Sequence, residues 1–171
     1  LAASQIAEEM PDRVCGIIYV AGMMLPDNTR FVDVVEACRE DEPSASGIWP
    51  YLDHLEGMSA VPPAAAIDIF YQDCDPDAAA AAAAKLTPQS NAARDVSPHT
   101  TKERFGTVPR VYIEALKDKS VVPVVQRRMQ DLVPGAAIRR IDTGHAPMLA
   151  DPARLSEILL QSIEELETGT G

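Results

Sequence analysis

Two residues in the last third of the chain, Asp118 and His145, have the types and positions that acid–base chemistry needs. His145 follows an apolar stretch and Gly144. An imidazole titrates near neutral pH, so it can take up and release a proton during a reaction. Asp118 follows the preceding apolar stretch, and a carboxylate beside the imidazole would fix its tautomer and stabilise its charged form. The pattern indicates a catalytic acid–histidine pair. The alternative is that His145 is a structural histidine in a loop and Asp118 an aspartate that caps a turn or a helix.

Glu114 and Asp142 are alternative acids for the same role. Glu114 lies within the predicted strand rather than past its end, and Asp142 is too close in sequence to His145 to face it easily. Two further histidines, His54 and His99, have no partner at a suitable spacing. This favours surface or capping roles for both.

The expected elements around the pair alternate between strand and helix. Residues 110–116 and 137–141 are apolar runs typical of strands, and 122–132 has helical periodicity. Asp151-Pro152 begins a final helix that extends to about Leu166, with a buried stripe of Leu155, Ile158, Leu159 and Ile163. Adjacent parallel strands lie about 4.8 Å apart, so residues that follow neighbouring strands meet at one edge of the sheet.

The N-terminal segment predicts a helix followed by a strand. Residues 1–10 are amphipathic, with Leu1, Ile6 and Met10 available for one face. The apolar run 14–25 has little alternation and suits a strand buried on both faces of a parallel sheet. Because Leu1 already lies within the amphipathic pattern, we expect an upstream segment to be missing from this sequence.

Between these parts, residues 27–108 predict a mostly helical cap. Helices are expected over Phe31–Arg39 and from Asp75-Pro76 to about Leu86. We therefore divide the chain into a core helix and strand (1–26), the cap (27–108) and a C-terminal core (109–171). Apolar and aromatic cap residues could line a substrate pocket or simply form the interior of the cap: Trp49, Tyr51, Leu52, Phe70 and Tyr71.

Composition excludes several classes of protein. The formal net charge of −11 opposes binding to nucleic acid and to anionic lipid. No stretch approaches the roughly 18 apolar residues of a membrane span. Cys15, Cys38 and Cys74 have no C-x-x-C spacing, so neither a disulfide framework nor a zinc site is predicted, and Cys15 is expected to be buried in its apolar run. No metal and no cofactor are expected, and a reducing cytoplasmic location is favoured.

Three segments resemble the α/β-hydrolase superfamily, in particular the plant methylesterase/hydroxynitrile lyase group and its bacterial pyrethroid-hydrolase-like carboxylesterase relatives. They are SQIAEEMPDRVCGIIYVAGMMLPDN, FYQDCDPDAAAAAAAKLTPQS and VPRVYIEALKDKSVVPVVQRRMQDLVPGAAIRRIDTGHAPMLADPARL. The order strand–Asp–helix–strand–His–helix is how that fold ends. The resemblance implies a parallel sheet flanked by helices, a cap, and Asp118 and His145 as triad acid and base.

The sequence departs from this pattern at the nucleophile. The family's serine lies on a G-x-S-x-G turn, and no such motif occurs here. The resemblance places that turn about four residues before Leu1. The N–H donors of the oxyanion hole would also lie upstream of Leu1. The available serines lie instead in cap loops or within a helix: Ser44, Ser46, Ser59 and Ser4. These residues alone are therefore expected to be inactive, with the N-terminal half of the same domain as their necessary partner.

These observations predict a serine carboxylesterase acting on a small hydrophobic ester, with a possible homodimer as its assembly. The alternative is a non-catalytic, hydrolase-like fragment or small-molecule binding protein, which the absence of a nucleophile would suit. Hydroxynitrile lyase activity is disfavoured, because the lyases of this group have a lysine directly after the triad histidine and Ala146 stands there.

Overall fold

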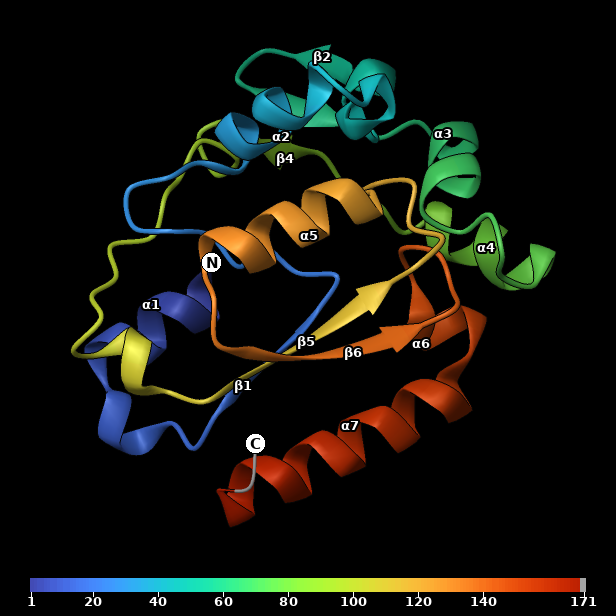
Figure 1. Cartoon of the computed structure of the whole chain (residues 1–171). Coiled ribbons are helices and arrows are strands. Elements are labelled where there is room, and N and C mark those ends of the chain that lie inside the picture. Colours follow the sequence, from blue (N-terminus) through green and yellow to red (C-terminus); the bar gives the residue numbers. More distant parts are fainter. Residues whose placement is uncertain (170–171) are drawn as a thin grey trace.

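The computed structural model describes residues 1–169, and a three-stranded parallel sheet forms its centre (Figure 1). The strand order is β1 (Ile17–Val20), β5 (Arg110–Ala115), β6 (Ala136–Ile141). β1 is shorter than the predicted run 14–25, because Ala21 takes a positive φ of 44° that ends the extended conformation. Cys15 precedes the strand and is exposed, so its predicted burial is wrong.

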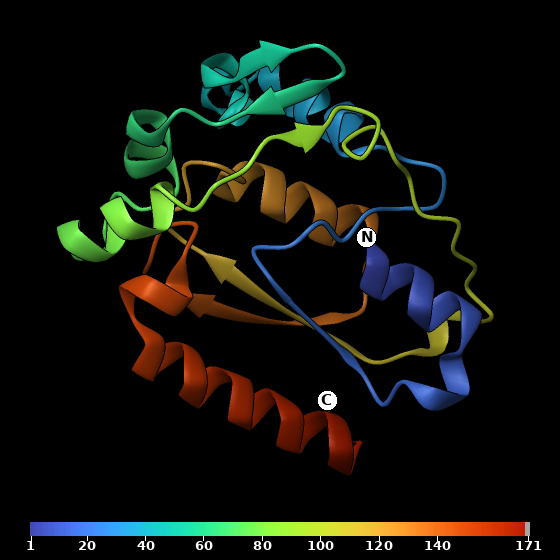
Figure 2. The same cartoon turned by 180° about the vertical axis from the view of Figure 1, so that it is seen from behind.

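Helices cover both faces of this sheet. On one face Tyr112 of β5 packs with apolar residues of α1 (Ala2–Glu9), α2 (Phe31–Arg39) and α5 (Pro123–Leu132). On the other face Val111, Ile113 and Ala115 pack against α7 (Pro152–Thr168). Figures 1 and 2 show α5 and α7 on opposite sides of the strands. Every residue of β5 is buried, as expected for a central strand of a sheet covered on two faces.

The helices of the core form where they were predicted, but their buried faces differ in part. α1 buries Ser4, Ala7 and Glu8, whereas Ile6 and Met10 are exposed. Glu8 is buried because its carboxylate accepts hydrogen bonds from the backbone N–H groups of Thr101 and Phe105, at 2.8 and 3.0 Å.

The final helix shows the same kind of difference. α7 is capped by Asp151, as predicted, and it buries Leu155 and Ile158. Ser162 takes the next buried position instead of Ile163, which is exposed. The Ser162 hydroxyl donates to the carbonyl oxygen of Ile158, which allows this polar side chain to lie in the interior.

Residues 27–90 form several short elements at the carboxyl ends of the strands and above α5, whereas η4 (Phe105–Thr107) lies beside α1, just before β5 begins (Figure 1). The helix predicted at Phe31–Arg39 is present, and α4 begins at the predicted Asp75-Pro76 cap. An antiparallel sheet that the sequence analysis did not predict joins β2 (Asp53–Leu55), β3 (Met58–Ala60) and β4 (Gln89–Ser90). The other helices and 3₁₀ turns of this segment are η2 (Pro43–Ser46), η3 (Trp49–Tyr51), α3 (Pro63–Ile69) and α4 (Pro76–Ala83). Outside it lie two more short elements, η1 (Pro11–Arg13) and α6 (Pro147–Ala150).

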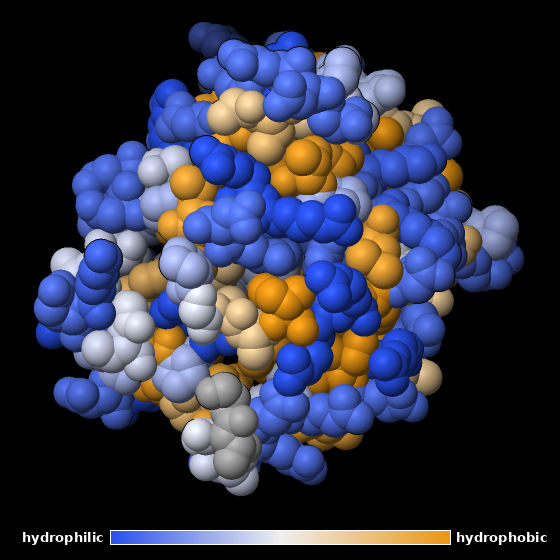
Figure 3. All heavy atoms as spheres, in the orientation of Figure 1, coloured by the Kyte–Doolittle hydropathy of each residue, from blue (hydrophilic) through white to orange (hydrophobic). Residues whose placement is uncertain are grey.

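The face seen in Figure 3 is mostly hydrophilic, with apolar side chains in separate patches between charged and polar ones. α5 illustrates the pattern: it buries Val125, Gln126 and Met129, while Val124 and Leu132 are exposed. Within residues 1–169, no helix is both long enough and apolar enough to cross a membrane.

Candidate active site

Asp118 and His145 form a hydrogen-bonded pair at the carboxyl ends of β5 and β6. The distance from His145 Nδ1 to Asp118 Oδ2 is 2.9 Å. The Asp118 side chain is fully buried, and its Oδ1 accepts from the backbone N–H groups of Ser120 and Val121 at 2.7 and 2.9 Å. Nearly a third of the His145 side chain is exposed (31%). The buried carboxylate is thus fixed by three hydrogen bonds, and the imidazole is left accessible on its other side.

Backbone pairing beyond the strands brings the two loops together. Leu116 N–H donates to the carbonyl oxygen of Ile141, and Lys117 N–H donates to that of Thr143, both at 2.9 Å. The acid loop is also held from α5 by the buried amide of Gln126. This amide donates to the carbonyl oxygens of Ala115 and Val121 and accepts from Ala115 N–H. Gln126 therefore satisfies backbone groups that a turn at the end of a central strand would otherwise leave unpaired.

The alternative acids have other partners. Glu114 is completely buried and forms ion pairs with Arg127 at 2.6 Å and Arg140 at 3.2 Å. Asp142 is exposed and pairs with Lys117 at 2.7 Å. Among the described residues, Asp118 is thus the carboxylate that His145 contacts.

Residues 70–73 of the cap lie directly on the acid and histidine loops. The Phe70 ring centroid is 5.2 Å from that of His145. Asp73 Oδ2 accepts from the Gly144 N–H at 2.6 Å, and Gln72 Nε2 donates to the carbonyl oxygen of Lys117 at 2.8 Å. A side chain at Gly144 would collide with the ends of Gln72 and Asp73, so this close approach depends on glycine.

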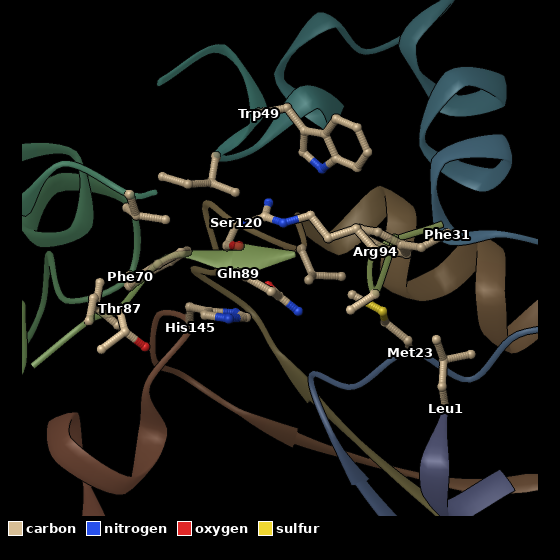
Figure 4. Close-up of a pocket in the computed structure, with 15 residues that line it drawn as sticks. Leu1, Met23, Phe31, Trp49, Phe70, Thr87, Gln89, Arg94, Ser120 and His145 are labelled. Atoms are coloured by element: carbon tan, nitrogen blue, oxygen red, sulfur yellow. The ribbon is translucent and has the colours of Figure 1, made fainter. Parts of the chain in front are cut away.

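A cavity of about 470 Å³ opens between the cap and the sheet edge, and His145 lines it (Figure 4). Of the five cap residues proposed as a pocket, Trp49 and Phe70 line this cavity with His145. The sequence analysis missed other lining residues, including Met23, Phe31, Thr87, Gln89, Arg94 and Ser120. They come from segments far apart in the chain, and nothing in their local sequence marks them.

The other three proposed pocket residues lie elsewhere. Tyr51 is about half exposed (52%) and lines a groove beside the acid loop, and Leu52 lines a neighbouring cavity. Tyr71 packs edge-on against Phe70, with ring centroids 6.0 Å apart. Burial raises the pKa of the Tyr71 hydroxyl, so it stays protonated at neutral pH.

No three His, Cys, Asp or Glu side chains within residues 1–169 are grouped to hold a metal ion. His54 and His99 are both exposed. Two hydroxyl-bearing residues, Thr87 and Ser120, line the cavity with His145. Neither they nor any other described group hydrogen-bonds to Nε2 of His145.

Gly47 supports the acid loop from the cap, and its replacement should be costly. Its φ is +53°, and an added Cβ would collide with the backbone carbonyl of Ser120, whose N–H binds Asp118. We expect Gly47→Ala to lower the free energy of unfolding by roughly 2–4 kcal/mol. Chemical denaturation would measure this loss. Gly57→Ala is the matched control, because Gly57 also has a positive φ but no atom within 4 Å of the new Cβ. Equal losses in the two variants would contradict the proposed collision.

No protein-family model matches the chain. Salicylic acid-binding protein 2 from Nicotiana tabacum is 30% identical in an alignment 166 residues long, gaps included, that covers 90% of this chain and 63% of that protein. A pyrethroid hydrolase from Sphingobium wenxiniae is 29% identical in an alignment 162 residues long that covers 91% of this chain and 57% of that protein. The chain thus spans less than two thirds of the length of these curated relatives.

The chain also covers about two thirds of the solved structures that it matches. The crystal structure of polyneuridine aldehyde esterase matches 94% of this chain and 66% of its own, with a TM-score of 0.75 at 21% identity. A pyrethroid hydrolase from Sphingobium faniae matches 97% of this chain and 66% of its own, with a TM-score of 0.73 at 22% identity. At these identities the likeness concerns the fold.

Proposed function

Because this chain has the α/β-hydrolase fold and is related along most of its length to members of that superfamily, we propose that the whole protein is a serine carboxylesterase. The observation that supports this most is the Asp118–His145 hydrogen bond beside a largely apolar cavity. The nucleophile is proposed to lie on a G-x-S-x-G turn in a segment that precedes Leu1, with one oxyanion donor just after it and the other on an earlier strand-to-helix loop.

In the proposed reaction His145 acts first as base and then as acid. Its Nε2 accepts the hydroxyl proton of the serine as Oγ attacks the carbonyl carbon of the ester. The same proton is then donated to the departing alkoxide, which leaves as an alcohol and gives an acyl-enzyme. Water next attacks the acyl group, its proton passes through His145 back to the serine, and the carboxylic acid is released. Asp118 keeps the proton of the neutral imidazole on Nδ1 and stabilises the imidazolium.

The cavity supports an ester with a hydrophobic part, because Trp49, Phe70, Met23 and Phe31 contribute apolar walls. Ala146 supports hydrolysis over cyanohydrin cleavage, since it has no charged group to hold a leaving cyanide. The free thiols of Cys15, Cys38 and Cys74 are consistent with a proposed reducing, cytoplasmic location.

Labelling with a fluorophosphonate would test the proposal on the whole protein. We expect stoichiometric labelling of a serine upstream of Leu1, loss of labelling after heat denaturation, and hydrolysis of 4-nitrophenyl butyrate by the unlabelled protein. A label on Ser120, which lines the same cavity, would overturn the proposed position of the nucleophile. A folded protein that neither labels nor hydrolyses the ester would instead favour the binding-protein alternative. Cyanide release from a cyanohydrin would favour the lyase.

A further inference from the structure

One positively charged side chain enters the cavity that His145 lines. Arg94 lies in the turn after β4, and it lines this cavity together with Trp49, Gln89 and Ser120. Figure 4 shows its side chain extending through the cavity in the space between Trp49 and His145, with the guanidinium end on the Ser120 side. An arginine on an exposed turn can reach bulk water, so its direction into an apolar cavity needs an explanation.

The Arg94 guanidinium has no partner among residues 1–169. Its Nε is buried and forms no hydrogen bond, and no ion pair involves its side chain. The nearest acid in sequence, Asp95, pairs with Arg30 at 2.8 Å, and Arg30 also pairs with Asp33 at 2.5 Å. Asp33 and Asp95 therefore pair with Arg30 and not with Arg94.

The cavity itself supplies no counter-charge. No Asp or Glu of the described chain lines it, although the whole sequence has a net charge of −11. Burial lowers the pKa of the Arg94 guanidinium, which nevertheless remains charged at neutral pH because arginine titrates so far above it. The partly buried guanidinium thus has no partner in the cavity, and a planar carboxylate can accept two parallel hydrogen bonds from a guanidinium.

We propose that Arg94 binds a carboxylate of the substrate, so that the preferred ester is a monoester of a dicarboxylic acid. The free carboxylate pairs with Arg94, the apolar walls enclose the hydrocarbon between the two ends, and the ester group reaches His145. A single guanidinium with the neutral side chains of Gln89 and Thr87 suits one negative charge. This inference rests on the proposed esterase function and specifies its substrate class.

A matched pair of substrates tests the inference in the whole enzyme. The probes are 4-nitrophenyl butyrate, which is neutral, and mono-4-nitrophenyl glutarate, which carries a carboxylate at the far end of its acyl chain. We expect the wild-type enzyme to have the higher kcat/KM for the glutarate. Arg94→Met should lower the glutarate-to-butyrate ratio of kcat/KM by about tenfold to a hundredfold, the range of a lost charge-assisted hydrogen-bond pair. Arg94→Lys should restore part of the ratio.

Controls separate this inference from the proposed function. Arg154→Met removes an equal charge from the exposed face of α7, where Arg154 pairs with Glu157, and the ratio should not change. An Arg94→Met enzyme that hydrolyses both esters with the wild-type ratio would overturn the inference and leave the esterase assignment intact. A wild-type enzyme that prefers butyrate would also overturn it. Failure of the wild type to hydrolyse either ester would overturn the proposed function itself.

Discussion

Replacing His145 by alanine should reduce kcat/KM of the whole enzyme for 4-nitrophenyl butyrate by about 10⁴- to 10⁶-fold, the loss seen when a serine hydrolase loses its base. Among the described residues, the side chain that hydrogen-bonds to the imidazole is that of Asp118, and its carboxylate is buried and also accepts from the Ser120 and Val121 N–H groups, so it is not placed to replace the base. The serine hydroxyl would keep its proton at neutral pH, and the leaving alkoxide would receive none. Steady-state hydrolysis and the rate of fluorophosphonate labelling should fall together.

His99→Ala is the matched control for this loss. His99 is exposed, and its backbone N–H donates to the side chain of Gln5, so the substitution leaves that contact in place. We expect its activity to stay within twofold of the wild type and both variants to melt at similar temperatures. A His145→Ala enzyme with more than a tenth of the wild-type activity would show that His145 is not the base.

Sequence periodicity predicted the elements that position the pair. The strands at 110–116 and 137–141 and the helices around 122–132 and 31–39 formed within a residue or two of their expected bounds. Each has a strong local signal, either a β-branched apolar run or a helical repeat of apolar residues. Because both Asp118 and His145 directly follow such strands, their meeting at one sheet edge could also be predicted, and the 2.9 Å hydrogen bond confirms that contact.

Features that depend on contacts between distant segments could not be predicted. Glu8 has the residue type of an exposed helix face, yet it is buried because Thr101 and Phe105, more than 90 residues later, donate to its carboxylate. The small sheet β2–β3–β4 is made of two- and three-residue strands, too short for a period of two to be recognised.

The cavity depends on such contacts as well. Met23, Arg94 and His145 come together only through the tertiary fold, so Trp49 and Phe70 were predicted from their residue type and Arg94 was not. Tyr51 also has the right residue type for a pocket, but the tertiary fold places it in a separate groove beside the acid loop.

Asp118→Asn should reduce kcat by about 10³- to 10⁴-fold while changing KM little. The substitution changes which nitrogen of the His145 ring carries the proton, and it leaves the cavity intact. The backbone N–H groups of Ser120 and Val121 require an acceptor, so the amide oxygen of the asparagine would face them. Its NH₂ group would then point at His145 Nδ1 and donate to it. This moves the imidazole proton to Nε2, the nitrogen that must accept the serine proton.

The tautomer can be measured separately from the activity. In ¹⁵N-labelled enzyme, proton NMR should show a strongly downfield Nδ1–H resonance for His145 in the wild type and its loss in Asp118→Asn. Asp142→Asn is the matched control, since Asp142 is exposed and pairs with Lys117, and its kcat should stay within about twofold of the wild type. If Asp142→Asn were as inactive as Asp118→Asn, the acid would be misassigned. If Asp118→Asn kept its kcat, the buried carboxylate would serve the stability of the loop and not the chemistry of His145.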